Sequence, residues 1–87
     1  DLECVLLNAC YSAYQADALC RHVPYVVGMD RAVPDRTAIE FAVGFYDTLG
    51  AQSERNYEFA FNLGRNAIKM ANLPGADIPQ FRACRGT

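Results

Sequence analysis

Cys10 is the residue whose type and position best fit covalent chemistry. It follows a short apolar run, Leu2–Leu7, that is typical of a buried strand, and it precedes a segment with helical spacing that begins at Ala13. A strand-to-helix junction is where open α/β sheets place their active sites, and a nearby helix start favours the thiolate. The position predicts a nucleophile. A packed, unreactive cysteine is the alternative.

Two aspartates, Asp30 and Asp35, lie in and at the end of the loop that follows a second apolar run, Val23–Met29. If both runs are parallel strands, this loop leaves the sheet at the same edge as Cys10. The two carboxylates are therefore candidate substrate-binding groups. Capping of the helix that starts at Asp35 is the structural alternative, because aspartate is a preferred N-cap residue.

The single histidine, His22, is poorly placed to serve as a base for Cys10. A helix over residues 13–22 would separate the two by about 15 Å, at 1.5 Å per residue. A general base must come within about 3 Å of the proton that it removes, or act through one water. His22 is therefore expected at a helix C-terminus or on the surface.

The four cysteines, at positions 4, 10, 20 and 84, do not suggest a disulfide framework. Cys4 and Cys10 would lie about 20 Å apart along one strand, which is too far for a bond. The spacings that are typical of zinc sites, such as Cys-x-x-Cys, do not occur. We therefore expect reduced thiols in an intracellular, cytoplasmic protein, with no metal and no cofactor.

The segments that would position these residues alternate strand, helix and strand. The Leu2–Leu7 strand is followed by a predicted helix, Ala13–Arg21, and by a second buried strand, Val23–Met29. Such short joints favour a right-handed crossover between two parallel strands.

Two longer helices and a final strand are predicted to follow. The first helix starts at Asp35 and ends at Gly50 as its C-cap, and the second runs from an N-cap at Ser53 to about Asn72. Ile78–Cys84 is predicted to be an edge strand. The buried face of the first helix is expected to hold Ile39, Ala42, Val43, Tyr46 and Leu49. The buried stripe of the second is expected to hold Tyr57, Ala60, Phe61, Gly64, Ala67, Ile68 and Ala71.

Gly44 and Gly64 fall inside these helices, where each costs about 1 kcal/mol relative to alanine. Their predicted use is close backbone packing. The fold class is thus α/β, with two parallel strands, an edge strand and three helices, in one small domain over residues 1–87.

Length and composition restrict the function classes. A hydrophobic content of 52% is high for 87 residues and suggests a surface that a partner covers. The net charge of −2 argues against a basic nucleic-acid-binding face. No apolar run reaches the ~20 residues that span a bilayer, and no signal peptide is recognisable. Neither nucleic acid nor a membrane is an expected partner.

Three blocks of the sequence resemble the second half of a CHAT domain, a family of caspase-like cysteine peptidases related to separase. These blocks are Leu7–Ala13, Val23–Met29 and Ala32–Asp35, within a resemblance that extends from Cys4 to about Asp77. The resemblance implies a caspase-like fold with Cys10 as the nucleophile.

In such peptidases the catalytic histidine, with a neighbouring glycine, lies on the strand before the cysteine strand. Because the sequence starts at Asp1, directly before the Cys10 strand, we expect the histidine-bearing half to be absent. The chain would then be a fragment or one subunit of a processed enzyme. The implied partners are that upstream half and a protein substrate, and association between copies stays open.

The resemblance also bears on substrate binding. In the separase-like pattern an aspartate of the loop after the second strand lines the pocket for a basic residue, and Asp35 is the closer match, followed by Asp30. Other caspase-like peptidases place an acidic residue two positions before the nucleophile. Here that position is Asn8, which departs from the pattern but could still shape the pocket.

The function implied is regulated, limited proteolysis of a protein by a cysteine endopeptidase. Because this chain lacks the base, it is expected to be inactive alone. The alternative is a degenerate caspase-like domain that serves as a scaffold or interaction module. A thiol redox protein is a third interpretation, which the lack of a resolving cysteine at useful spacing disfavours.

Overall fold

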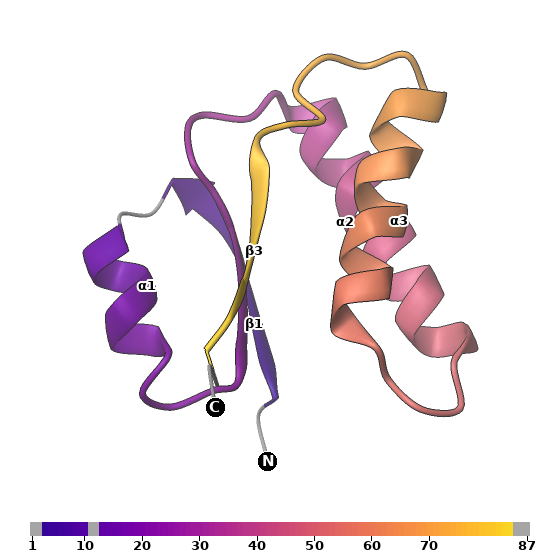
Figure 1. Cartoon of the computed structure of the whole chain (residues 1–87). Coiled ribbons are helices and arrows are strands. Elements are labelled where there is room, and N and C mark those ends of the chain that lie inside the picture. Colours follow the sequence, from indigo (N-terminus) through magenta and orange to yellow (C-terminus); the bar gives the residue numbers. More distant parts are fainter. Residues whose placement is uncertain (1–2, 11–12, 85–87) are drawn as a thin grey trace. The chain divides into compact units, whose positions relative to one another are not determined.

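The structure is a computed structural model that describes residues 3–10 and 13–84. In chain order its elements are β1 (Cys4–Cys10), α1 (Ala13–Leu19), β2 (Tyr25–Met29), α2 (Asp35–Ala51), α3 (Tyr57–Met70) and β3 (Pro79–Ala83) (Figure 1). The chain divides into a sheet unit, Asp1–Ala32 with Ile78–Thr87, and a hairpin unit, Val33–Asp77. The described fold is a small mixed α/β fold, as predicted, whereas its caspase-like character stays a prediction.

The sheet unit is built around β2, which lies between β1 and β3. β1 runs parallel to β2, with Cys4 opposite Tyr25 and Cys10 opposite Met29. β3 runs antiparallel to β2 over its whole length. The β2 residues from Val26 to Met29 are buried, as is usual for an apolar strand with neighbours on both sides. The predicted parallel pair and the predicted edge strand are therefore both confirmed.

The hairpin unit packs α2 against α3 through aromatic side chains. The ring of Phe41 stacks on Phe45 with centroids 5.8 Å apart, and it meets Phe61 edge-on at 5.7 Å. Tyr57, Ala60, Phe61, Gly64 and Ile68 form the buried side of α3. This stripe confirms five of the seven residues predicted for the buried face of the second long helix. Ala67 is only partly buried, and Ala71 is exposed because it is the C-cap, where the helix ends.

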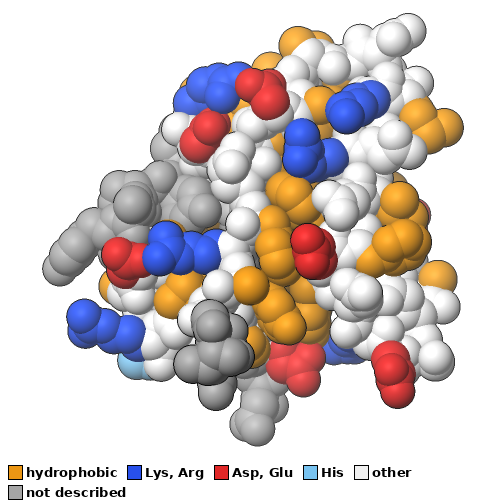
Figure 2. Space-filling view, viewed as in Figure 1, with side chains coloured by type: hydrophobic (Ala, Val, Ile, Leu, Met, Phe, Trp, Pro, Cys, Tyr) orange, Lys and Arg blue, Asp and Glu red, His pale blue; other side chains and the backbone are white. Residues whose placement is uncertain are grey.

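The buried face predicted for α2 is wrong. Three of its expected members, Ile39, Val43 and Tyr46, are 60%, 52% and 55% exposed. The buried residues of α2 are instead Thr37, Phe41 and Phe45. α2 carries apolar side chains on two opposite sides, and burying the side with two phenylalanines removes more apolar surface from water. The other apolar side of α2 stays exposed. Figure 2 shows that hydrophobic side chains also lie on the surface of the molecule.

The predicted boundaries between the two long helices are also wrong. Gly50 lies inside α2, whose C-cap is Gln52, and α3 is capped by Asn56 rather than Ser53. The side-chain oxygen of Asn56 accepts a hydrogen bond from the backbone N–H of Phe59 at 3.0 Å. Gln52 Oε1 in turn accepts from the N–H of Asn56 at 2.9 Å. Since asparagine caps as well as serine, the position that completes both bonds decides where α3 begins.

Gly44 and Gly64 mark the closest approach of α2 and α3. A Cβ atom added to Gly64 would lie 2.9 Å from two ring carbons of Phe41 and 3.0 Å from its carbonyl oxygen. A Cβ on Gly44 would lie 3.1 Å from the Cα of Gly64. Close backbone packing, predicted for both glycines, is therefore confirmed.

We predict that Gly64→Ala lowers the free energy of unfolding by about 1–3 kcal/mol, because the new methyl group collides with Phe41. This loss would outweigh the gain in helix propensity of about 1 kcal/mol. Urea unfolding measures the effect. Gly50→Ala is the matched control, because its added Cβ would meet no atom within 4 Å apart from its chain neighbours and the backbone of its own helix, and its stability should stay unchanged or rise. A Gly64→Ala chain as stable as the wild type would contradict the close approach.

Candidate functional site

Cys10 is the last residue of β1, at the carboxyl end of the parallel strand pair. Its Cα is paired with that of Met29, the last residue of β2, so that Asp30 is the first residue beyond the sheet on the neighbouring strand. This edge is where parallel α/β sheets bind ligands. The side chains of Cys10 and Asn8 lie outside the described part of the structure, so their predicted roles rest on backbone position alone.

The backbone of β1 is irregular directly before Cys10. The register of the β1–β2 pair is regular from Cys4 to Leu6 and shifts between Leu6 and Cys10. The four residue steps from Leu6 to Cys10 on β1 lie opposite only two steps on β2, from Val27 to Met29. Irregularities of this kind re-aim side chains and are common beside active sites. Asn8 belongs to this stretch, which continues the strand in distorted form instead of ending it as the sequence predicts.

Asp30 is an exposed residue at the same edge as Cys10. Its carboxylate accepts a hydrogen bond from Arg31 Nη1 at 3.0 Å and lies 3.4 Å from Gln80 Nε2. The backbone N–H of Asp30 donates to the carbonyl of Ile78 at 3.1 Å. An exposed ion pair of this type contributes little stability. A cationic ligand can therefore replace Arg31 at low cost while the backbone bond keeps the aspartate in place.

Asp35 differs from Asp30 in two respects. It is the first residue of α2 and belongs to the hairpin unit, so only Asp30 is brought to the Cys10 edge by the sheet unit itself. The N-cap of α2 is Pro34, which makes no side-chain cap hydrogen bond. The N-cap role considered for Asp35 is thus wrong. An acidic residue in the first turn still interacts favourably with the helix dipole.

His22 lies at the other end of the sheet unit from Cys10. It follows α1, where its backbone N–H donates to the carbonyl of Leu19 at 2.9 Å, and its side chain is exposed. It precedes Tyr25, whose register partner is Cys4, at the start of β2. The four residue steps of β2 alone span about 13 Å. The structure thus agrees with the expectation that His22 cannot act on Cys10.

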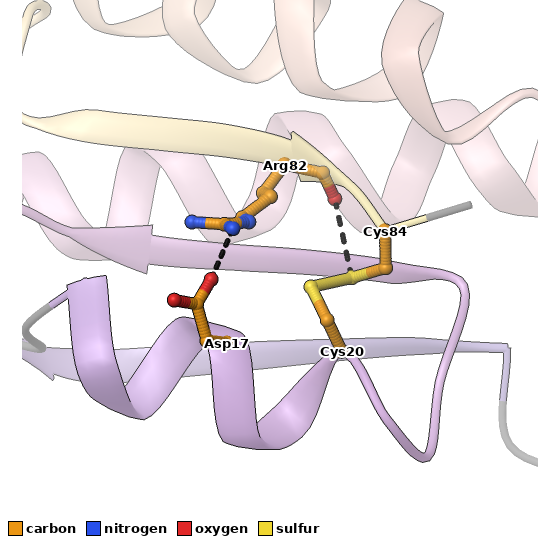
Figure 3. Close-up of a disulfide and its surroundings, with 4 residues drawn as sticks. All are labelled: Asp17, Cys20, Arg82 and Cys84. Atoms are coloured by element: carbon orange, nitrogen blue, oxygen red, sulfur yellow. Dashed lines mark hydrogen bonds and ion pairs between the residues drawn. A yellow bond between two sulfur atoms is a disulfide. The ribbon is translucent and has the colours of Figure 1, made fainter. Parts of the chain in front are cut away.

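The expectation that the thiols are reduced is overturned for two of the four cysteines. Cys20 and Cys84, 64 positions apart, form a disulfide with a Cα–Cα distance of 5.0 Å (Figure 3). The antiparallel β2–β3 ladder brings them together, because it carries Cys84 to Pro24, where its N–H donates to the carbonyl at 2.7 Å. Closing a loop of this size stabilises a fold by about 4 kcal/mol in the chain-entropy model.

Sequence reasoning missed this bridge because it tested only the pair within the first strand. A usable signal was present. Cys20 precedes the second predicted strand, Val23–Met29, and Cys84 ends the predicted edge strand. Antiparallel pairing of those two strands puts both cysteines at the same end of the sheet.

Among the cysteines whose side chains the structure describes, Cys4 is free, and it is half-buried within β1. Burial raises the pKa of its thiol from 9.0 to about 11, because a thiolate is poorly solvated there. At pH 7 only about one Cys4 side chain in ten thousand is then ionised. The raised pKa therefore makes Cys4 a poor nucleophile at neutral pH.

In the part of the chain that the structure describes, no group of three His, Cys, Asp or Glu side chains is arranged to hold a metal ion. None of the helices in residues 3–10 and 13–84 is long and apolar enough to cross a membrane.

We predict that Cys10 is the thiol that reacts with iodoacetamide in the folded chain at pH 7. Cys4 is protonated at this pH, and Cys20 and Cys84 are bonded to each other. Alkylation followed by peptide mapping without reduction checks this expectation. Faster labelling of Cys4 would contradict it. The same experiment above pH 11, where Cys4 ionises, should label both residues.

Neither the protein-family models nor the curated proteins contain a match to this sequence. The resemblance to a CHAT domain therefore rests on the residues of the sequence itself. What the structure adds is independent of any family. Cys10 stands at the carboxyl end of a parallel strand pair, with Asp30 beside it and without a histidine at that edge among the described residues.

Proposed function

We propose that this chain is the nucleophile-bearing part of a cysteine endopeptidase of the caspase-like, CHAT type. The observation that supports it best is the position of Cys10 at the carboxyl end of β1, paired in parallel with β2. The irregular register before Cys10 adds support, because such distortions accompany active sites. The activity is limited, regulated cleavage of a protein substrate.

In the proposed reaction the Cys10 thiolate attacks the carbonyl carbon of the scissile peptide bond. The C–N bond then breaks, a histidine gives its proton to the leaving amine, and water hydrolyses the resulting thioester. His22 is too far away, so the base comes from another segment. We place that segment along β1, an edge of the described sheet whose residues Cys4–Leu7 are uncharged and half-exposed.

Asp30 is our first choice for recognition of a basic substrate residue. It directly follows Met29, the β2 residue paired with Cys10, and its carboxylate already holds a guanidinium, that of Arg31. Asp35, the closer match to the family pattern, stays a second candidate. Asn8, in the irregular stretch of β1, is proposed to shape the pocket.

The alternative function is a scaffold or interaction module without catalysis. The exposed hydrophobic side chains of the hairpin unit favour it, since Ile39, Val43, Tyr46, Phe59 and Met70 are each more than half exposed. A partner that covers them would serve either function. Association between copies of the chain is one such arrangement.

The cytoplasmic location expected from the sequence belongs to this proposal. The Cys20–Cys84 disulfide weighs against it, because disulfides persist mainly in oxidising compartments. The two are compatible only if the bridge is opened by cytoplasmic thiols.

We predict that the chain alone does not turn over fluorogenic peptides. Without a base at the Cys10 edge, activity should fall by several orders of magnitude relative to a complete site. Wild type and Cys10→Ala should therefore be indistinguishable from buffer. Turnover that Cys10→Ala abolishes would show that a base is present and would overturn the assignment of His22.

We predict that the Cys10 thiol is alkylated faster by a peptidyl chloromethyl ketone ending in arginine than by its leucine counterpart. This test of the proposed site does not need a catalytic base, because the probe carries its own leaving group. A ratio of about tenfold corresponds to 1.4 kcal/mol of selective binding. Mass spectrometry of the intact chain measures both rates.

Asp30→Asn should bring the two rates together, and Asp35→Asn is the matched control with the same loss of charge. If Asp35→Asn alone removes the selectivity, Asp35 is the specificity residue instead. If neither reagent reacts at Cys10 faster than at an unfolded chain, the proposed active site is wrong.

A further inference from the structure

The Cys20–Cys84 disulfide borders a hollow at the surface of the sheet unit. The hollow has a volume of about 320 Å³ and is lined by Cys20, Arg21, His22, Val23, Pro24 and Cys84. Both bonded cysteines are only partly buried. The space is large enough for a small molecule to reach the sulfur atoms without unfolding of the sheet.

The charge of the residues that line the hollow favours an anionic ligand. Arg21 and His22 are exposed, and the described residues of the lining include no acidic side chain. The nearest described carboxylate along α1, that of Asp17, forms an ion pair with Arg82 (Figure 3). Because Asp17 and Arg82 offset each other, Arg21 supplies the positive charge of the residues that line the hollow.

The disulfide fastens the C-terminal end of β3. β3 is an edge strand with three exposed residues, held to β2 by its ladder and by the stacked rings of Tyr25 and Phe81, 5.7 Å apart. Cys84 lies just beyond β3, and Cys20 follows α1. The bridge therefore joins the two stretches of chain that form the sheet unit on either side of the hairpin unit.

Opening the bridge would leave a hydrogen-bond acceptor near one of the released thiols. The Sγ of Cys84 lies 4.0 Å from the carbonyl oxygen of Arg82, to which a reduced thiol can donate (Figure 3). Of the two bonded cysteines, Cys20 is the one that directly precedes Arg21 and His22 in the sequence. An anion held by Arg21 is thus beside Cys20, with Cys84 as the leaving group.

We propose that the Cys20–Cys84 disulfide is an exchange site for small anionic thiols of the glutathione class, and that its reduction releases the end of β3. The thiolate attacks Cys20 Sγ, the protein S–S bond breaks, and Cys84 leaves as a thiolate that takes up a proton. A second small thiolate then attacks the sulfur of the first small thiol in the mixed disulfide, and Cys20 leaves as a thiolate that takes up a proton. In sum, two small thiols are oxidised to their disulfide and the protein bridge is reduced to two thiols.

The test uses the full chain with its free thiols alkylated beforehand. Reduction is followed with 3-mercaptopropionate, which is anionic, and with 2-mercaptoethanol, which is neutral, and each rate is divided by the thiolate concentration. At low salt we expect the anionic thiol to react about fivefold faster. In 1 M salt, where the Debye length is about 3 Å, the ratio should fall towards one.

Arg21→Gln should remove the preference for the anionic thiol. Arg55→Gln, which changes the same charge between α2 and α3, should keep it. Acid quenching and peptide mapping should find the mixed disulfide on Cys20. After reduction, hydrogen exchange should quicken at the Ala83 end of β3 more than at its Pro79 end.

Equal rates for both thiols at low salt, or unchanged selectivity in Arg21→Gln, would overturn the anion preference. A bridge that is reduced only in urea, or a β3 strand whose exchange is unaffected by reduction, would overturn the exchange site. Because Cys10 is alkylated beforehand and no peptide is cleaved, these measurements are independent of the proposed peptidase function.

Discussion

The two hydrogen-bonded ladders along β2 are the constraint on which the sheet unit depends. The parallel ladder sets Cys10 opposite Met29, and the antiparallel ladder carries Cys84 to the start of β2 beside Cys20. Because β2 is buried from Val26 onward, its backbone groups need partners on both sides. One strand thereby positions a candidate nucleophile at one end of the sheet and a disulfide at the other.

The cysteines show how position rather than residue type decides thiol chemistry. Cys4, inside β1, is kept protonated by burial. Cys20 and Cys84 are not free thiols, because strand pairing brings two segments far apart in sequence together and the two cysteines form a disulfide. Cys10 is left as the candidate nucleophile at the edge where parallel sheets bind ligands. The strands separate the two sites, so each can react without the other.

In the hairpin unit, the buried apolar area and the close approach of the two helices decide the packing more than the spacing of the apolar residues does. α2 has apolar residues on two sides, and the side with Phe41 and Phe45 is buried against Phe61 and its neighbours. Glycine at position 64 lets the Phe41 ring approach the α3 backbone. The aliphatic side of α2 stays exposed, which supplies an apolar surface for a partner under either proposed function.

Local patterns in the sequence were sufficient to predict the strand–helix–strand order, the C-terminal edge strand, the buried stripe of α3 and the tight packing at Gly44 and Gly64. These features depend on residues within a few positions of one another, where periodicity and residue size carry the information. The position of Cys10 at a strand end was predictable for the same reason.

The Cys20–Cys84 bridge, the irregular register before Cys10 and the buried side of α2 were decided only in three dimensions. Each depends on which distant segment lies alongside. The bridge joins residues 64 positions apart, and the register of β1 is defined only against β2. The choice between the two apolar sides of α2 depends on the surface that α3 offers. Such choices are made by packing and pairing between segments, which no local pattern contains.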